Sequence, residues 1–524
     1  SSKATYVCDL PEIIKSDLNI IAKQDDFTPK IADERRLLAK FFTKSNQKGE
    51  RTPKVPTELF GEKFSMREHQ LEALREWKKK KFEGILELAT GTGKTITSIY
   101  AATRIIESNS GISLIVVVPY TDLAEQWVNE LKLFNIRALR CYGKKDDWYP
   151  ELKNYFARNI EKQSEFIALV VVNKTFKDRP FQSLMKNFDQ TRTVFIGDEC
   201  HHHSSQSFQD KLPYDAKFKL GLSATPFHYI DDNANDRLKS FYGQSVYTYS
   251  LYEAINNGVL TPYEYYPIPV ELTLDEAEHY HELTDKIRQQ FSYGSTNSNN
   301  KNEHLQALLM RRARLVGTAS NKLVELEKLV IEQGVPTHSL FYCSDGSIQK
   351  DEFEFLEHES ELTIESPMEE VKQRQAVGRL LRRHNVSASP FTSDESSFQR
   401  KEILQNFKDG VVSALIAMKC LDEGIDVPAC STAYILASSR NPRQFIQRRG
   451  RILRKSPGKD KAVIFDFVTV LPNTQIDKSP REINFFQNEL GRVADFAKHS
   501  IHPLASIKKL NPWLEAYDLF HLVV

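Results

Sequence analysis

Ile85-Leu-Glu-Leu-Ala-Thr-Gly-Thr-Gly-Lys-Thr95 decides the fold, because it joins a short apolar segment to a glycine-rich loop. A helical pattern follows over residues 96–106. A strand, a glycine-rich loop and a helix in this order are typical of a phosphate-binding loop. Gly91 and Gly93 let backbone amides surround phosphate oxygens, and the N-terminus of the helix adds partial positive charge. The stretch therefore predicts a nucleotide site in a parallel α/β fold.

The polar residues of this loop have separate expected roles. We expect Lys94 to reach the β- and γ-phosphates of ATP and the Thr95 hydroxyl to bind Mg²⁺. Thr90 and Thr92 complete the expected phosphate cradle. The strict form of the motif has glycine at the position of Leu88, and the flanking strand and helix patterns offset this departure.

Two adjacent acids supply the expected second half of the nucleotide site. Asp198 and Glu199 follow the apolar segment 193–196. We expect Asp198 to hold Mg²⁺ and Glu199 to polarise the attacking water as a general base. The three histidines at 201–203 lack the spaced partners of a zinc site, because consecutive side chains point in different directions. His201 is instead expected to form hydrogen bonds within the nucleotide site.

Apolar segments of strand length alternate with helical patterns in two regions. The first region contains segments 85–88, 112–118, 166–172, 193–196 and 219–222, and the second contains segments 339–342, 386–391, 414–417, 433–436 and 462–465. We therefore predict an accessory segment at 1–63, an ATP-binding lobe at 64–245, a connecting segment at 246–324, a second lobe at 325–470 and a helical tail at 471–524. The connecting segment carries helical patterns at 273–290 and 304–330, and residues 345–370 form an acidic insertion.

Composition excludes several classes of protein. The 524 residues include 71 basic and 70 acidic side chains, so the chain is neither a cationic nucleic-acid coat nor an acidic disordered tail. No apolar segment approaches the roughly 18 residues that a membrane helix needs, and no secretory signal is expected. The first residue is Ser, so we expect either a processed start or a sequence that lacks the natural N-terminus. Six scattered cysteines form no CxxC pair, a pattern that favours a reducing, cytoplasmic location.

These motifs together resemble the superfamily 2 helicases and translocases, over about residues 64–467. The sequence Asp198-Glu-Cys-His201 is similar to the DECH motif of type III restriction subunits and of repair translocases like xeroderma pigmentosum group B. Gly221-Leu-Ser-Ala-Thr-Pro226 resembles the motif in which Ser223 and Thr225 couple the ATP site to nucleic acid. The segment 66–70 resembles the adenine-binding motif, in which Gln70 meets the base and Arg67 supports it. The resemblance implies two tandem RecA-like lobes.

The second lobe carries the remaining ATP-site motifs of the family. Residues 421–428 resemble motif V, which implies that Gly424 and Asp426 approach the nucleotide. Residues 447–454 resemble motif VI, which implies that Arg451 and Arg454 are arginine fingers for the γ-phosphate and that Gln447 lies near the attacking water. The similar sequence at 375–383 precedes motif V, so we expect it to be a surface helix instead.

Nucleic-acid contacts are implied at four loop positions. Pro119 and Thr121 lie in a segment that looks like motif Ia, and Asn173 occupies the place of the next strand-contacting motif. Thr392 lies in a strand-end loop of the second lobe. Loops of this kind contact mainly the sugar-phosphate backbone, so they position a strand without reading its sequence.

The function that the resemblance implies is an ATP- and Mg²⁺-dependent motor on duplex DNA, in restriction, repair or phage defence. A nuclease, defence or repair subunit is the candidate partner, and no membrane is involved. Two alternatives stay open on the sequence alone. One is an RNA helicase that uses the same ATP site, and the other is an ATPase switch that senses nucleic acid and controls a partner.

Overall fold

The computed structural model describes the chain from Thr52 to Leu522 with ten gaps. The gaps are residue 60 and residues 160–165, 229–230, 293–298, 345–346, 349–370, 393–394, 419–429, 438–441 and 473–479. The acidic insertion and the motif V segment therefore lie largely or wholly outside the described residues. A short antiparallel pair, β1 (Glu58–Leu59) and β2 (Glu62–Lys63), precedes the first lobe.

The first lobe contains a seven-stranded sheet in which every strand pairing is parallel. Its spatial order is β5-β6-β4-β7-β8-β3-β9. The strands are β3 (Glu83–Leu88), β4 (Ser113–Val118), β5 (Ala138–Cys141), β6 (Ile167–Val172), β7 (Thr193–Asp198), β8 (Phe218–Ser223) and β9 (Ser245–Tyr249). Because all strands are parallel, their carboxyl ends share one edge, where ligands bind in open α/β sheets.

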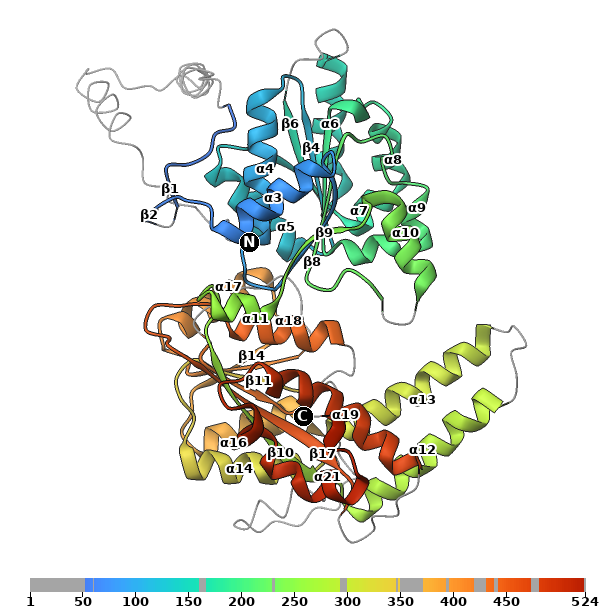
Figure 1. The fold of residues 1–524 in the computed structure, drawn as a ribbon, viewed down its shortest axis with the longest axis vertical. Coiled ribbons are helices and arrows are strands. Elements are labelled where there is room, and N and C mark those ends of the chain that lie inside the picture. Colours follow the sequence, from blue (N-terminus) through green and yellow to red (C-terminus); the bar gives the residue numbers. More distant parts are fainter. Residues whose placement is uncertain are drawn as a thin grey trace, which may run out of the picture. The chain divides into compact units, whose positions relative to one another are not determined.

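Helices cover both faces of this sheet (Figure 1). They are α3 (Glu68–Lys79), α4 (Lys94–Ser108), α5 (Thr121–Leu133), α6 (Lys145–Asn159), α7 (Asn173–Lys177), α8 (Arg179–Met185), α9 (Gln206–Gln209) and α10 (Asp232–Tyr242). Alternate residues of β4 belong to different cores: Val116 packs in the core that contains Trp127 of α5, whereas Val117 packs with Phe241 of α10. A strand buried on both faces needs an uninterrupted apolar sequence, and β4 has one.

The second lobe contains a six-stranded sheet that is also entirely parallel. Its order is β10-β17-β16-β11-β15-β14. The strands are β10 (Tyr263–Glu271), β11 (Ser339–Tyr342), β14 (Ala388–Phe391), β15 (Ala414–Ala417), β16 (Thr432–Ile435) and β17 (Ala462–Val470). A further antiparallel pair, β12 (Ser347–Ile348) and β13 (Val371–Lys372), borders the undescribed segment 349–370. Both predicted lobes are therefore parallel-sheet α/β structures.

The helices of the second half include a long hairpin and a helical tail. They are α11 (Leu251–Asn256), α12 (Leu274–Ser292), α13 (Asn299–Gly317), α14 (Asn321–Gln333), α16 (Gln373–Arg383), α17 (Ser397–Lys408), α18 (Pro442–Ile452), α19 (Pro480–Lys498), α20 (Pro503–Ile507) and α21 (Asn511–Tyr517). In Figure 1 the helices α12 and α13 lie side by side as a hairpin. The motif-like sequence at 375–383 is a helix, α16, as predicted, and the tail after 471 is helical.

Every predicted strand is present, but three strands of the two large sheets were not predicted. These are β5, β9 and β10, of which β10 lies in the expected connecting segment and pairs with β17 along nine residues. The helical pattern at 304–330 is split into α13 and α14 at Thr318–Ser320. No helix among the described residues is long and apolar enough to cross a bilayer.

Candidate nucleotide site

The phosphate-binding loop has the conformation that its glycines permit. Gly91 and Gly93 adopt φ values of 89° and 92°, in the region that side chains with a Cβ rarely occupy. The Thr92 hydroxyl donates a 2.7 Å hydrogen bond to the Ala89 carbonyl and so closes the loop. Helix α4 begins at Lys94, which directs the partial positive charge of its N-terminus at the loop.

Helix α3 supports the loop from the side. The Gln70 amide accepts from the Arg67 backbone N–H at 2.9 Å and donates to the Gly93 carbonyl at 3.4 Å. His69 lies 3.1 Å from the Thr92 carbonyl and stacks on Tyr249 with ring centroids 4.1 Å apart. Both polar atoms of the Gln70 side chain thus have partners within the protein. Arg67 lines the cavity beside the loop, whereas Gln70 lies behind the loop.

Asp198 sits at the carboxyl end of β7 and is almost fully buried. Its Oδ2 accepts a 2.7 Å hydrogen bond from the indole N–H of Trp127, and its Oδ1 accepts from the Glu199 backbone N–H at 3.0 Å. Burial raises the pKa of Asp198 above its usual value, and the neighbouring Glu199 charge adds to the increase while Lys94 opposes it. A nearby cation would therefore stabilise the ionised form of Asp198.

Glu199 is the centre of a polar network that reaches the second lobe. Its Oε2 lies 3.5 Å from the Ser223 hydroxyl and 3.5 Å from His201 Nδ1. His201 Nδ1 is also 3.2 Å from the Ser223 hydroxyl, which accepts from the Thr225 backbone N–H at 3.2 Å. From α18, the Gln447 amide donates to Glu199 Oε2 at 3.4 Å. The network joins the ends of β7 and β8 to motif VI.

The three consecutive histidines have three different partners. His201 lies beside Ser223, His202 Nε2 lies 3.5 Å from the Tyr120 hydroxyl, and His203 Nδ1 lies 2.7 Å from the Tyr242 hydroxyl. Burial lowers the pKa of His203 to about 3, so this imidazole is neutral. His203 points away from the other two, as expected, but the His201 and His202 rings lie beside each other with centroids 4.4 Å apart.

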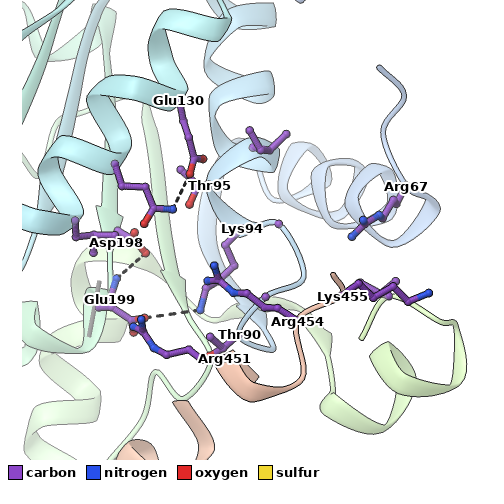
Figure 2. Close-up of a pocket in the computed structure, with 16 residues that line it drawn as sticks. Arg67, Thr90, Lys94, Thr95, Glu130, Asp198, Glu199, Arg451, Arg454 and Lys455 are labelled. Atoms are coloured by element: carbon purple, nitrogen blue, oxygen red, sulfur yellow. Dashed lines mark hydrogen bonds and ion pairs between the residues drawn. The ribbon is translucent and has the colours of Figure 1, made fainter. Parts of the chain in front are cut away.

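A cavity of about 540 Å³ lies over the phosphate-binding loop. It is lined by Arg67, Thr90, Gly91, Gly93, Lys94, Thr95, Ile96, Leu123, Gln126, Glu130, Asp198, Glu199, Val259, Arg451, Arg454 and Lys455. Figure 2 shows the Lys94, Glu199 and Arg451 side chains converging, with Glu130 beside Thr95. All the predicted nucleotide- and metal-binding residues of the first lobe except Thr92 and Gln70 line this cavity.

Two buried polar atoms fit a bound triphosphate. The Lys94 ammonium nitrogen has no hydrogen-bond partner among the described residues, and its nearest acidic atom is Glu199 Oε1 at 3.8 Å. The Thr90 hydroxyl is also buried without a hydrogen bond in the described part of the chain. Buried polar groups normally have partners, so these two atoms mark places where a ligand oxygen would bind. Thr95 and Asp198 line the same cavity and supply oxygen atoms, the ligand type that Mg²⁺ prefers.

Motif VI divides its arginines between two tasks. Arg451 and Arg454 line the cavity, as predicted. Arg448 donates to the Ala437 carbonyl at 2.9 Å, and Arg449 forms a 2.7 Å ion pair with Asp495 of α19. The first pair faces the cavity and the second pair anchors the helix in its own lobe.

The phosphate-binding loop and α18 are in van der Waals contact. A Cβ placed on Gly450 would lie 2.5 Å from the Thr90 Cβ, and a Cβ placed on Gly91 would lie 3.0 Å from the Arg454 Cγ. Glycine at both positions allows the two segments to approach closely. The gap between Thr90 and motif VI is therefore too narrow for any larger residue at position 450.

Helix α5 contributes cavity residues that the sequence analysis missed. Leu123, Gln126 and Glu130 all line the cavity, and the Gln126 amide donates to Glu130 Oε1 at 2.6 Å. Trp127, which binds Asp198, belongs to the same helix. Gln126, Trp127 and Glu130 lie three, four and seven residues after Leu123, which places all four side chains on one helical face. This helical spacing, in the helix that follows β4, is the sequence signal that could have identified these residues.

The predicted nucleic-acid residues follow the carboxyl ends of three parallel strands. Pro119 follows β4, Thr121 begins α5, Asn173 begins α7 after β6, and Thr392 follows β14. Two of these side chains already have partners within the protein. The Asn173 amide oxygen lies 3.4 Å from His203 Nε2, and the buried Thr392 hydroxyl donates to Glu395 at 2.9 Å. Gly424 and Asp426 lie outside the described residues.

Two family models match the chain. Residues 63–228 match the model described as Type III restriction enzyme, res subunit, and residues 355–456 match the model described as Helicase conserved C-terminal domain. The first match ends just beyond the Ser223–Thr225 motif and the second ends just beyond Arg454. Each match therefore contains one wall of the cavity.

Curated relatives include motors and restriction subunits. The chain is 27% identical over 421 residues to the DNA 3'-5' translocase XPB2 of Sulfurisphaera tokodaii, covering 79% of this chain and 84% of that protein. It is 25% identical over 195 residues to the type I restriction enzyme EcoAI endonuclease subunit of Escherichia coli, covering 36% of this chain and 22% of that protein. The likeness to the translocase extends over both lobes.

A solved structure shows the same fold. The ATP-dependent type ISP restriction-modification enzyme LlaBIII bound to DNA superposes with a TM-score of 0.54 at 15% identity. The match covers 87% of this chain and 32% of that chain, so the chain spans about a third of that enzyme. At this identity the likeness concerns the arrangement of the two sheets and their helices.

Proposed function

The chain is a superfamily 2 helicase, and from this premise we propose that it couples ATP hydrolysis to movement along duplex DNA. The observation that carries the proposal is that the two lobes contribute complementary groups to one cavity. Lys94, Asp198 and Glu199 come from the first lobe, and Arg451 and Arg454 come from the second. Such a site is complete only when both lobes surround the nucleotide, so ATP binding favours one arrangement of the lobes over others.

Binding of ATP uses the loop and its lysine. The backbone amides around Gly91 and Gly93 surround phosphate oxygens, and the buried Lys94 ammonium neutralises their charge. Thr95 and Asp198 would hold Mg²⁺, which supplies charge neutralisation on the phosphates when it is bound. Arg67, at the edge of the cavity, contacts the part of the nucleotide that lies away from the phosphates.

Hydrolysis requires a base and a stabiliser of the developing charge. Glu199 is the base, because it lies 3.8 Å from Lys94 and lines the cavity where the attacking water would be held. The Gln447 amide donates a hydrogen bond to the Glu199 carboxylate and so orients it. Arg451 and Arg454 stabilise negative charge on the transferred phosphoryl group in the transition state.

Coupling to DNA runs through the network around Glu199. Ser223 and His201 connect this carboxylate to the end of β8, and His203 connects the same segment to Asn173 at the end of β6. A change at Glu199 during hydrolysis would therefore reach a predicted DNA-contacting loop. DNA is proposed as the track because the translocase relative, which matches over both lobes, is named for DNA.

The test is a comparison of ATP hydrolysis without nucleic acid and with duplex DNA, single-stranded DNA or RNA at fixed salt. We expect duplex DNA to give the strongest stimulation and Lys94→Ala to abolish hydrolysis. Lys79→Ala, on the exposed end of α3, is the control and should hydrolyse ATP at the wild-type rate. Displacement of a third strand from a DNA triplex would then measure movement. Stimulation by RNA alone, or an active Lys94→Ala variant, would refute the proposal.

We further propose that DNA cleavage or repair chemistry belongs to a partner subunit. The E. coli relative is named as one subunit of a restriction enzyme. Incubation of the chain with supercoiled plasmid, ATP and Mg²⁺ should therefore leave the plasmid uncut. Linear or nicked product from highly purified protein, absent in a Lys94→Ala preparation, would contradict this division of tasks.

A further inference from the structure

The end of helix α18 carries the two arginines that face the nucleotide. The helix ends at Ile452, so Arg451 lies in its last turn and Arg454 lies two residues beyond its end. The last carbonyl groups of a helix have no partner within the helix and are free to move unless other groups bind them. The position of both guanidinium groups therefore depends on what holds this terminus.

Three successive carbonyl groups at this terminus are held by neighbouring segments. The Lys459 ammonium donates hydrogen bonds to the Ile452 carbonyl and, at 2.9 Å, to the Arg454 carbonyl. Between them, the Leu453 carbonyl accepts from the Thr261 backbone N–H at 2.8 Å. The chain folds back after Arg454, and this brings the Lys459 side chain, five residues later, to the end of α18.

The Lys459 side chain is largely withdrawn from water. Burial lowers the pKa of Lys459 to about 8. The neighbouring Cys430 thiol has the opposite effect and raises this pKa. A cation at the C-terminal end of a helix also faces the negative end of the helix dipole. The neighbouring cavity contains four further ionisable side chains, which are His338, Lys408, Asp460 and Lys461. Lys461 is paired with Glu264 on β10 at 2.8 Å.

We propose that Lys459 is a positioning residue that holds Arg451 and Arg454 against the nucleotide. The ammonium joins the Ile452 and Arg454 carbonyl groups, which fixes the direction in which the chain leaves α18. Without it, Arg454 loses the constraint that keeps it packed on Gly91. Lys459 itself does not line the ATP cavity, so it acts through the arginines. The inference rests on the proposed ATP hydrolysis and adds a residue that no helicase motif in the sequence contains.

The first experiment compares Lys459→Met with Lys461→Met. Methionine keeps an unbranched side chain that is only one atom shorter and removes the donor, and Lys461 is an exposed lysine two residues away. In DNA-stimulated hydrolysis we expect Lys459→Met to lower kcat about tenfold and Lys461→Met to leave it unchanged. Fluorescent ADP should bind both variants equally, whereas a non-hydrolysable ATP analogue should bind Lys459→Met several-fold more weakly, because the arginines face the γ-phosphate.

The outcomes separate this inference from the proposed function. A wild-type chain that hydrolyses no ATP would refute the proposed function. A wild-type chain with normal hydrolysis and a Lys459→Met variant with unchanged kcat and analogue affinity would refute only the role of Lys459. Equal weakening of ADP and the ATP analogue would also refute it, because that result indicates general damage to the fold.

A second variant covers the case in which Lys459→Met does not fold. Lys459→Arg keeps a donor that stays charged at all accessible pH values. The wild-type rate should fall as the pH rises through about 8, because Lys459 then loses its proton. The Lys459→Arg rate should persist to higher pH. If the hydrolysis rates of the wild type and of Lys459→Arg fell over the same alkaline pH range, the inference would be overturned.

Discussion

Trp127 and Asp198 are joined by a 2.7 Å hydrogen bond from the indole N–H to Oδ2. The bond links the middle of α5 to the carboxyl end of β7, and both residues are buried. The other carboxylate oxygen accepts from the Glu199 backbone. The Asp198 carboxylate is thus fixed in orientation before any metal binds, which is the arrangement that a preorganised site requires.

Replacement of Trp127 by Phe should therefore slow hydrolysis without preventing nucleotide binding. A hydrogen bond to a charged group contributes about 1.5–3 kcal/mol, which corresponds to roughly a tenfold to hundredfold loss of kcat if it is needed in the transition state. The measurement is saturated ATP hydrolysis with duplex DNA. The control is Trp77→Phe, which removes an indole bond to the Lys219 carbonyl in the same lobe. Equal rates in the two variants would show that Trp127 acts only in packing.

The arginines of α18 should separate by function when they are replaced one at a time. Arg451→Ala removes charge from the cavity and should lower kcat by about a thousandfold, the order expected for an arginine finger, with a melting temperature close to that of the wild type. Arg449→Ala breaks the ion pair with the partly exposed Asp495 and should cost about 2 kcal/mol of stability. Hydrolysis assays and thermal unfolding of both variants test the division. An inactive but fully stable Arg449→Ala protein would contradict it.

The sequence predicted most strands from their apolar residues and missed β5, β9 and β10, which are interrupted by polar residues or prolines. The strand β10 contains Pro267 and Pro269, which cannot donate hydrogen bonds to a neighbouring strand. The structure explains why they are tolerated, because among the described strands β10 lies at the edge of its sheet and pairs with β17 alone. Its sheet membership depends on a partner about 200 residues later in the chain, which no local pattern reveals.

Motif spacing predicted residues that line the cavity but not those that hold them. Lys94, Glu199 and Arg451 lie in motifs whose chemistry is local, and all three line the cavity. Trp127 and Lys459 act through bonds made possible by folding, and they belong to no motif. Gln70 was expected to contact the base; in the structure its Nε2 donates to the Gly93 carbonyl of the loop and its Oε1 accepts from the Arg67 backbone N–H.

Stability at low pH should depend on His203. Asn173 offers its amide oxygen to His203 Nε2, so that nitrogen carries the proton and Nδ1 accepts from the Tyr242 hydroxyl. The folded-state pKa is about 3, below the usual value of 6.5, so the neutral form is favoured by folding. The contribution of neutral His203 to the free energy of unfolding is fully present above pH 6.5. It is lost at up to about 1.4 kcal/mol per pH unit as the pH falls from 6.5 toward 3, because only the unfolded chain then binds the proton.

Urea unfolding between pH 7.5 and 5 tests this dependence. His203→Gln should be less stable than the wild type at pH 7.5, and its unfolding free energy should decrease less steeply on acidification. His279→Gln, on the exposed surface of α12, should follow the wild-type slope. Parallel curves for the wild type and His203→Gln would show that this imidazole takes up its proton in the folded protein as well.

Gly450→Ala should block the approach of the two lobes while leaving each lobe folded. The added methyl group would lie 2.5 Å from the Thr90 Cβ and 3.1 Å from the Thr90 carbonyl oxygen, so the phosphate-binding loop or α18 must move. Both segments carry residues that line the cavity, and a displacement near 1 Å costs about a hundredfold in rate when positioning is lost. DNA-stimulated kcat should fall by at least tenfold, with ADP binding to the first lobe retained.

The matched control is Gly491→Ala in α19, where the methyl group meets nothing within 4 Å and should add up to about 1 kcal/mol of stability. Wild-type turnover in Gly450→Ala would mean that hydrolysis does not require contact between Thr90 and α18.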